Sequence, residues 1–529
     1  MEIPRMGLPD DLTARLSMPE QHDELRRRSM SGRSVSRRRL LAATAGAAAA
    51  VAVAGAPAAA AFWRQGGIPG KYVLPFGRHL AWGANPRTQV RVGWQVPHPV
   101  HKPFARVGLK PGDLGARIPA EVRPLATHLL GIKPVQQYYL HVALDHLEPG
   151  RRYYYTVGHH GYDDTKTGRI DTFATAPTRR SVPGPFTFTA FGDQGVSYHA
   201  LSNDGMVAAQ RPAFHLHAGD LCYADSSGHG HGSDLFQPRA WDQFLAQTEP
   251  VASSVPWMPT LGNHDMEALY SSDGYGGQRA RWDFPDNGPS KATGAYSFIY
   301  GNVGVIALDS NDVCYEISAN HGYTHGSQTR WLAKRLAFLR TQPDVDFVVV
   351  FHHHCAFSSA VQHASEGGVR KHWLPLFDKY RVDLVINGHN HIYERADTVH
   401  AGKIRKTPIG DTVHPEKHGT TYVTAGAAGR GLYGFAAPDS YLGHVHDVDE
   451  VPSAVSNAAG HHVMERVGWS RVRYTGYSFL AVDVAPAAAG STTTLTLRAL
   501  TEFGAEIDHL TIARKASGHS RAHLSDSAS

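Results

Sequence analysis

Five short apolar runs in the chain end in side chains that can bind a metal ion. The ends read GDQG, GDLCY, GNHD, VFHH and GHNH, and their candidate ligands are Asp193, Asp220, Tyr223, Asn263, His353, His389 and His391. Each alone has an ordinary explanation, because Asp and Asn frequently occupy caps and turns and a strand histidine frequently belongs to the core. Five such ends in one part of the chain indicate a shared site.

The residue types indicate the chemistry of that site. Asp, Asn and His supply oxygen and nitrogen donors, which suit Fe, Zn or Mn rather than thiolate-binding metals. Two ions about 3.5–4 Å apart need one carboxylate in common and separate donors for each ion. Such a pair holds a phosphoryl group, and the pKa of water bound to it falls to near neutrality or below.

The elements around these residues predict an α/β domain with helices on both faces of a sheet. Open α/β sheets bind ligands at the carboxyl ends of their strands, where the candidate ligands stand. The predicted strands span 186–191, 295–309 (two strands joined near Gly301 and Asn302), 346–354, 382–389 and 420–429. The predicted helices span 239–247, 328–339 and 372–380.

The pattern of apolar and polar residues changes along the chain, and these changes predict its other parts. Residues 67–178 alternate apolar and polar side chains in short runs, which predicts a β-sandwich of the immunoglobulin or fibronectin type III kind. The catalytic domain is expected to span 185–515 and to include C-terminal strands. Within it, 433–470 is rich in Gly, Ala, His and Ser and is expected to be a long loop. Residues 516–529 are polar and are expected to be disordered.

Residues 1–61 have the features of a twin-arginine export signal. Arg37 and Arg38 form the pair, two leucines and an alanine-rich run follow, and small residues near Ala59 and Ala61 supply a cleavage site. The alternative is a transmembrane anchor. Because alanine contributes little to insertion, we expect a cleaved or loosely anchored signal, the twin-arginine machinery as a partner, no stable membrane span after processing, and a secreted or cell-surface protein.

Charge and cysteine content exclude some classes of function. The 529 residues carry a formal charge of +5, but the part after residue 61 carries only +2, from 43 basic and 41 acidic residues. This near-neutral body argues against specific nucleic-acid binding. Three cysteines are too few for a disulfide framework, and 34 histidines suit a metal protein.

The set GDxG, GDxxY, GNHD, VxxH and GHxH resembles the calcineurin-like metallophosphoesterases. The tyrosine three residues after the second aspartate, and the IYER run after GHNH, resemble the purple acid phosphatases within that superfamily. The resemblance covers about residues 67–515. It implies an N-terminal sandwich followed by a βαβαβ catalytic domain with four layers, α/β/β/α.

The resemblance also implies how two metal ions are held. One ion, expected to be Fe(III), would take Asp193, Asp220, Tyr223 and His391. The other, expected to be Fe(II), Zn or Mn, would take Asp220, Asn263, His353 and His389. Asp220 would bridge the pair, and tyrosinate on Fe(III) would give the protein a visible colour.

The VxxH motif meets three consecutive histidines, and counting from Val350 selects His353 as the ligand. Strand alternation then turns His352 and His354 to the opposite face. By the same resemblance, His264 would contact the phosphate or protonate the leaving group.

His363 and Glu366 stand where the family carries further groups beside the metals, and they join His264 as predicted catalytic residues. The alternative for these two is a polar surface loop. The chain departs from the family at Cys355, a position where proline is frequent, and at Asp265, where plant members often have Glu. Cys355 could be redox-sensitive or pair with Cys222, and a quietly buried thiol is favoured; Cys314 has no predicted role.

The prediction is a secreted acid phosphatase that hydrolyses small phosphate monoesters by in-line attack of a metal-bound hydroxide. His264 or His363 would protonate the departing alkoxide. Alternatives are a phosphodiesterase or nucleotide hydrolase on the same metals, or an alkaline phosphatase of the D type. A non-catalytic surface module that binds through its sandwich is the alternative from another class.

Overall fold

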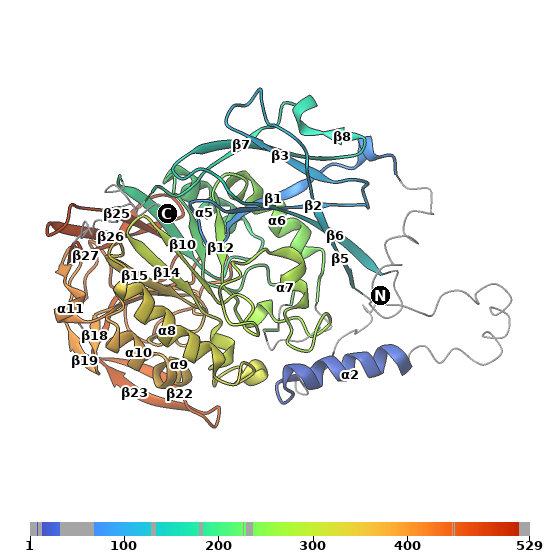
Figure 1. Ribbon diagram of the computed structural model, residues 1–529. Coiled ribbons are helices and arrows are strands. Elements are labelled where there is room, and N and C mark those ends of the chain that lie inside the picture. Colours follow the sequence, from blue (N-terminus) through green and yellow to red (C-terminus); the bar gives the residue numbers. More distant parts are fainter. Residues whose placement is uncertain are drawn as a thin grey trace, which may run out of the picture.

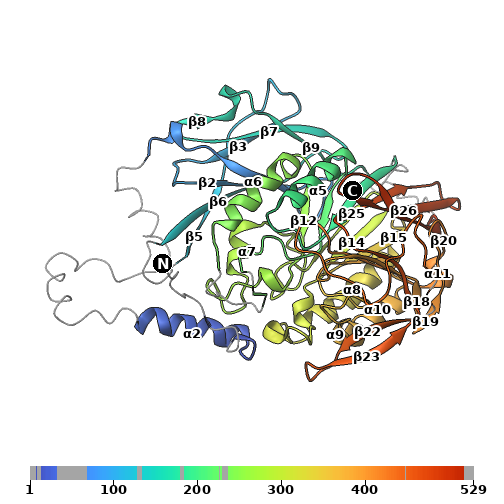
Figure 2. The same cartoon turned by 180° about the vertical axis from the view of Figure 1, so that it is seen from behind.

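The computed structural model describes residues 8, 13–31, 68–127, 134–178, 184–225, 227–228, 236–446, 448 and 450–517. These residues form an N-terminal β-rich domain and a larger domain in which helices cover two stacked seven-stranded sheets. Figure 1 shows the N-terminal domain at one end of the molecule, beside helix α6, and Figure 2 shows this arrangement from behind. A β-rich domain followed by an α/β domain confirms the predicted fold class.

The N-terminal domain has two antiparallel sheets. One has the order β1–β2–β6–β5 and the other β4–β3–β7–β8, with β9 paired to β7. Their strands are β1 (Phe76–Trp82), β2 (Val90–Val96), β3 (Phe104–Gly108), β4 (Ile118–Pro119), β5 (Glu121–Thr127), β6 (Val135–Leu144), β7 (Arg152–His159), β8 (Tyr162–Asp163) and β9 (Asp171–Ala174). Buried Trp82, Trp94 and Tyr155 bring side chains of both sheets into one apolar core. The specific likeness to fibronectin type III stays a prediction.

This domain packs against helix α6 (Ala240–Ala252) of the larger domain. The Tyr155 hydroxyl donates to the Ser253 carbonyl at 2.7 Å, and the Gly77 N–H donates to Glu249 at 3.0 Å. None of the predicted ligands comes from the N-terminal domain or from α6. The contact between the two therefore stabilises the helix layer that covers the first sheet and supplies no ligand.

The first sheet of the larger domain has the order β12–β11–β10–β25–β26–β27–β20, and the second has β13–β14–β15–β16–β21–β17–β24. The first contains β10 (Phe186–Phe191), β11 (His215–His217), β12 (Trp257–Pro259), β20 (Thr412–Val413), β25 (Ser478–Ala485), β26 (Thr492–Thr501) and β27 (Glu506–Lys515). The second contains β13 (Tyr296–Tyr300), β14 (Val303–Ala307), β15 (Phe347–Phe351), β16 (Leu384–Asn387), β17 (Tyr393–Ala396), β21 (Thr421–Ala425) and β24 (Ser470–Tyr474). Strands β10 to β12 run parallel, as do β14, β15, β16 and β21.

Three apolar clusters define four layers. The two sheets share one core, to which Phe188, Leu216, Val349 and Ile386 contribute. Helices α5 (Tyr198–Ala209) and α6 cover the outer face of the first sheet. Helices α8 (Ser327–Thr341), α9 (Gly367–His372) and α10 (Leu374–Lys379) cover the second. The predicted α/β/β/α layering is therefore present.

The placement of apolar residues in the sequence explains why the central strands and the helices that cover them form where they do. Strand β15 reads FVVVF and is buried along its whole length, because parallel strands covered on both faces are apolar throughout. In α8, Leu332, Leu336 and Leu339 are fully buried on the face toward the sheet. The smaller helices and strands are η1 (Gly70–Tyr72), η2 (Asp164–Lys166), η3 (Asn263–Asp265), α7 (Gly276–Arg281), η4 (Ser310–Asp312), η5 (Ser318–Asn320), β18 (Thr398–His400), β19 (Lys403–Arg405) and α11 (Pro415–His418).

The structure differs from the prediction of a long loop over 433–470. Strands β22 (Val451–Ser456) and β23 (His462–Val467) form an antiparallel hairpin there, and β24 begins at Ser470. Most of β23 is exposed, so its sequence lacks the apolar alternation that indicates a half-buried strand.

The predicted signal region contains a helix that the sequence did not indicate, α2 (Met18–Ser31). Met18 is fully buried, and His22 Nδ1 lies 2.6 Å from the Ala268 carbonyl oxygen, so α2 contacts the larger domain. The arginine pair and the cleavage site lie outside the described residues, and the export signal stays a prediction. Every helix in the described ranges is too short or too polar to cross a membrane.

The chain stays ordered into the start of the predicted tail. The Ala516 N–H donates to the Ser491 carbonyl at 2.8 Å, and the N–H and hydroxyl of Ser517 both donate to Asp346 at 2.8 Å. The remainder of the predicted tail lies outside the described residues.

Candidate metal centre

The seven predicted ligands stand where five strands end. Asp193 follows β10, Asp220 and Tyr223 follow β11, Asn263 follows β12, His353 follows β15, and His389 and His391 follow β16. All seven side chains are buried. The carboxyl ends of the parallel strands of both sheets therefore meet at one place, as open α/β sheets require of a ligand site.

Four of these residues have left-handed backbone conformations. The φ angles are 61° at Asp193, 53° at Asp220, 57° at Tyr223 and 70° at His389. Positive φ is uncommon outside glycine and costs free energy, so it persists where surrounding structure fixes it, frequently at functional sites. Here it turns the chain sharply after β10, β11 and β16 and directs these side chains toward a common centre.

The first donor group contains Asp193, Tyr223 and His391. The Tyr223 hydroxyl lies 3.1 Å from Asp193 Oδ1 and 2.9 Å from His391 Nε2, and His391 Nε2 lies 3.5 Å from Asp193 Oδ1. On the other side of its ring, His391 Nδ1 donates to the Gly431 carbonyl at 2.6 Å. Because that hydrogen bond places the proton on Nδ1, the Nε2 lone pair faces Asp193 and Tyr223.

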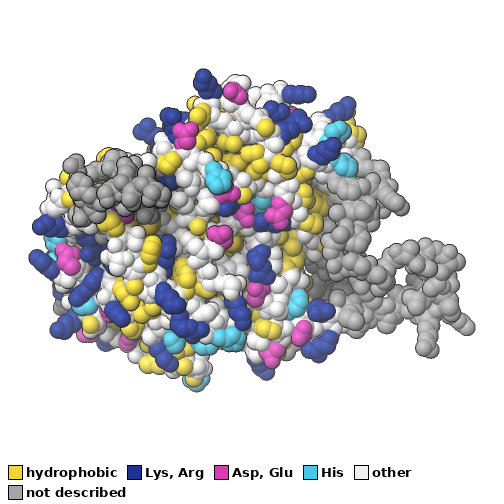
Figure 3. Space-filling view, viewed as in Figure 1, with side chains coloured by type: hydrophobic (Ala, Val, Ile, Leu, Met, Phe, Trp, Pro, Cys, Tyr) yellow, Lys and Arg dark blue, Asp and Glu magenta, His cyan; other side chains and the backbone are white. Residues whose placement is uncertain are grey.

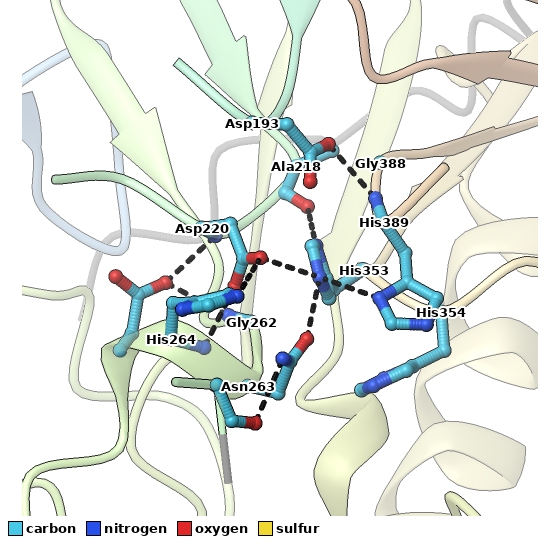
Figure 4. A network of polar contacts seen from close by, with 12 residues as sticks. Asp193, Ala218, Asp220, Gly262, Asn263, His264, His353, His354, Gly388 and His389 are labelled. Carbon is cyan, nitrogen blue, oxygen red and sulfur yellow. Dashed lines mark hydrogen bonds and ion pairs between the residues drawn. The ribbon is translucent and has the colours of Figure 1, made fainter. Parts of the chain in front are cut away.

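The second donor group contains Asp220, Asn263, His353 and His389 (Figure 4). His353 Nε2 lies 3.0 Å from Asn263 Oδ1, 3.3 Å from Asp220 Oδ2 and 3.3 Å from His389 Nδ1. Its other nitrogen, Nδ1, donates to the Ala218 carbonyl at 2.8 Å.

Asp220 connects the two groups. Ligand atoms of Asp193, Asp220 and His353 all lie within 4.8 Å of one another. The structure thus brings all seven residues together in the two predicted sets; their roles as metal ligands stay a prediction.

Glycines leave room for the two carboxylates. A Cβ atom on Gly262 would lie 2.1 Å from Asp220 Oδ1, and one on Gly388 would lie 2.5 Å from Asp193 Oδ2. Such distances are far inside van der Waals contact. The motifs GNHD and GHNH need glycine because the carboxylates occupy that space.

The charges of the cluster suit a cation. Burial alone raises the pKa of Asp220, but the imidazoles of His353 and His264 outweigh it and hold that pKa well below its usual range. Burial alone lowers the pKa of His353, but the Asp220 and Asp193 carboxylates raise it to about 9. Burial and the same two carboxylates raise the pKa of Tyr223 well above its ordinary value. A cation among these donors would displace the His353 proton and favour the tyrosinate, so the residues fit a metal pair.

The three predicted catalytic residues lie in different settings. His264 is beside the cluster: its N–H donates to Asp220 Oδ1 at 2.9 Å, its Nδ1 to the Asp225 carbonyl at 2.7 Å, and its Nε2 is 3.9 Å from Asp220 Oδ2. The His363 ring lies 4.1 Å from the His389 ring, centroid to centroid. The Glu366 carboxylate accepts from the N–H groups of residues 315, 316 and 368 and from the Cys314 thiol, so it serves the local backbone.

The three consecutive histidines differ from the prediction in one respect. His352 does turn away, against Trp373 and Phe377 in the helix layer. His354 does not, because its ring lies 4.5 Å from that of His389 and 5.0 Å from that of His353. Strand β15 ends at Phe351, so the alternation of a strand no longer applies at His354.

The three cysteines are buried free thiols, and no disulfide joins Cys222 to Cys355. The Cys355 thiol donates to the Gly388 carbonyl at 2.9 Å, within the GHNH turn. It therefore packs behind the ligands, as the quietly buried alternative required.

Several neighbours of the site had no role assigned from the sequence. The Asp265 carboxylate accepts from the N–H groups of Asp220 and Gly262, both at 2.8 Å, and fixes the turn that holds Asp220. Tyr433 stacks on the His391 ring at 4.0 Å. The Arg430 guanidinium lies 4.5 Å from the centre of the Tyr223 ring. The form GNHD marked Asp265, whereas no motif marked Tyr433 or Arg430.

Comparison with known proteins agrees with this geometry. The family model described as "Purple acid Phosphatase, N-terminal domain" matches residues 75–175, and that of the calcineurin-like phosphoesterases matches residues 186–393. An uncharacterized protein of Mycobacterium tuberculosis is 32% identical over 505 residues, which are 88% of this chain and 92% of the relative. Purple acid phosphatase 21 of Arabidopsis thaliana is 30% identical over 50% of this chain and 54% of its own.

Two further comparisons bear on fold and activity. A solved purple acid phosphatase from yellow lupin (Lupinus luteus) seeds superposes with a TM-score of 0.63 at 20% identity, over 86% of this chain and 78% of the lupin chain, and shows the fold alone. Another Arabidopsis relative, 29% identical over 56% of this chain and 50% of its own, is named a probable inactive purple acid phosphatase. Taken with the strand-end donors, the two family models and the relatives place this chain in the family of purple acid phosphatase-like metallophosphoesterases.

Proposed function

We propose that the protein is an exported acid phosphatase that hydrolyses small phosphate monoesters with a two-metal centre. The observation that supports this most strongly is the position of Asp220 between two complete donor groups. Fe(III) is proposed beside Tyr223, and Fe(II), Zn or Mn beside His353. When bound, such ions supply Lewis-acid charge and lower the pKa of water.

The chain's own residues can bind the ester and move a proton. Since His264 Nδ1 donates to the Asp225 carbonyl, its Nε2 faces the cluster, and once the ring is protonated its Nε2–H can donate to the departing alkoxide. His363, against His389, is the second candidate for that role. The Arg430 cation near Tyr223 complements a dianion, which favours a monoester over the singly charged diester.

The test compares two substrates on metal-loaded full-length protein. A higher kcat/KM for p-nitrophenyl phosphate than for bis(p-nitrophenyl) phosphate is expected, with Asp220→Asn as the inactive control. Preference for the diester would favour the phosphodiesterase alternative. If protein that holds two metals hydrolyses neither ester, the binding-module alternative is favoured. Turnover has to be measured directly, because one relative is named a probable inactive purple acid phosphatase.

Export through the twin-arginine pathway is part of the proposal and is supported by the sequence at Arg37 and Arg38. Replacing both by lysine should retain the folded, metal-loaded protein in the cytoplasm. Unchanged export of the double variant would contradict this route. The face of the molecule in Figure 3 mixes cationic and anionic side chains, in keeping with the expectation of a small ester as the partner.

A further inference from the structure

One carboxylate outside the predicted ligand set faces three histidines. Glu316 lies in the loop between η4 and η5, after β14. Its Oε1 lies 3.1 Å from His363 Nδ1 and 3.3 Å from His462 Nε2, and its Oε2 lies 3.6 Å from His389 Nε2. The Glu316 side chain is only 12% exposed. Four segments far apart in the sequence therefore meet at one side chain.

The contact with His389 is the informative one. His389 Nδ1 faces His353 and the ligand cluster, and its Nε2 faces Glu316. Both His389 Nε2 and Glu316 Oε2 are buried, and neither has a hydrogen-bond partner among the described residues; the 3.6 Å between them is just beyond hydrogen-bond length. A neutral imidazole has one N–H, so a lone pair on Nδ1 requires the proton on Nε2. Glu316 is the acceptor placed to hold it there.

The other two predicted histidine ligands are held differently. His353 and His391 each donate Nδ1–H to a backbone carbonyl, of Ala218 and Gly431 respectively. A lone pair on Nδ1 would give His389 the opposite tautomer, and the group that its Nε2 faces is a carboxylate. A carboxylate behind a ligating histidine orients the ring and makes it a stronger donor than a carbonyl does.

The loop that carries Glu316 is fixed by Glu366. The Glu366 carboxylate accepts from the N–H of Tyr315 at 2.9 Å and of Glu316 at 3.2 Å, and it also caps α9. Glu366 is 1% exposed. The residue that the sequence placed in catalysis thus positions the backbone of Glu316.

Glu316 also orients the predicted proton donor. Because His363 Nδ1 lies at Glu316, the His363 Nε2 faces the other way and lies 3.5 Å from the Tyr433 hydroxyl. The His363 ring is held against His389, and both rings depend on the same carboxylate.

We propose that Glu316 is a positioning residue of the metal centre: it holds the Nε2–H of His389 so that Nδ1 faces the metal, and it orients His363 toward the ester. This rests on the proposed two-metal function. Glu316, His363 and His389 could also enclose a cation, since their ligand atoms lie within 4.8 Å, but His389 would then have to bridge two metals. We therefore favour the hydrogen-bonding role.

The test measures metal affinity without any ester. Metal-free wild type, Glu316→Gln and Glu316→Ala are titrated with Zn²⁺ against a competing chelator. The weaker of the two equivalents should bind about 10–100-fold less tightly in both variants, and the equivalent next to His391 should be unchanged. Glu502→Gln is the matched control. Glu502 also accepts a hydrogen bond from a histidine, His199, at 2.9 Å, but this pair lies outside the cluster. The control variant should bind Zn²⁺ as tightly as wild type.

Kinetics add a second measurement. Glu316→Gln at saturating Zn²⁺ should still lose kcat, through His363, while circular dichroism and thermal unfolding of the metal-free protein match wild type. Unchanged affinity for both equivalents would overturn the proposal. Loss of a third equivalent with the first two unchanged would overturn it in favour of an additional cation site. Failure of wild type to hydrolyse the monoester would sink the proposed function and leave the affinity comparison in force.

Discussion

The two sheets of the larger domain supply different kinds of donor to the site. The first sheet, through the turns after β10, β11 and β12, supplies oxygen donors from Asp193, Asp220, Tyr223 and Asn263. The second, through the turns after β15 and β16, supplies the imidazoles. In Figure 4, Asp220 and Asn263 lie on one side of His353, and His389 lies on the other. Neither sheet carries a complete site, so a metal pair would also tie the sheets together.

The two sides also differ in how their donors are held. Three of the oxygen-side residues, Asp193, Asp220 and Tyr223, have left-handed backbone conformations, and Gly262 leaves room for the Asp220 carboxylate. The histidines follow β15 and β16, which are buried along their whole length, and their outer nitrogens face carbonyls or Glu316. His389 also has a left-handed φ of 70°, so backbone turns serve both sides, and the contacts behind the rings distinguish the histidine side.

The largest effect should follow from removing the carboxylate that serves both groups. Asp220→Asn should lose both metals, and kcat should fall by more than the roughly 100-fold that loss of an outer hydrogen-bond partner costs. Elemental analysis and p-nitrophenyl phosphate turnover measure this. Near-normal turnover with two metals bound would refute the shared carboxylate.

On the histidine side, alanine variants at 352, 353 and 354 separate ligand from packing. His353→Ala should lose one metal and most activity, since only His353 contacts both Asn263 and Asp220 among the three. His352→Ala should keep its metals and lose about 1–3 kcal/mol of unfolding free energy, because His352 packs in the helix layer. Greater metal loss at 352 than at 353 would reverse the assignment.

On the oxygen side, Tyr223→Phe should abolish any visible charge-transfer band and leave the fold intact. The Tyr223 hydroxyl lies 3.1 Å from Asp193 Oδ1 and 2.9 Å from His391 Nε2. Its removal deletes one metal donor and leaves the backbone of the turn unchanged. Absorption spectra of the iron-loaded variant and wild type test this. A band that persists in the variant would remove Tyr223 from the iron.

The last prediction concerns the contact between the two sheets, and its effect is on stability alone. Stripping the metals should lower the unfolding free energy of the larger domain by about 4 kcal/mol when free metal had been about 1,000 times its Kd. Calorimetry should show this in the transition of the larger domain, with that of the N-terminal domain unmoved. Equal shifts in both transitions would mean that the metals do not specifically stabilise the contact between the two sheets.

The sequence indicated the ligands because each stands in a motif after an apolar strand. Glu316 escaped prediction because it lies in an irregular loop, and a lone Glu between Tyr and Ile carries no pattern. His354 was misjudged because strand periodicity was extended past Phe351, where the strand ends. His462 was missed because its strand, β23, is mostly exposed, so the sequence there has no apolar alternation that would predict a strand.

The most direct test of a two-metal centre shared by the two sheets is elemental analysis of the purified, folded protein together with its visible spectrum. We expect about two metals per chain, iron among them, and a tyrosinate-to-iron band. Two metals without a band would retain the centre but free Tyr223 from iron. No bound metal, even after reconstitution with iron and zinc, would refute the two-metal centre.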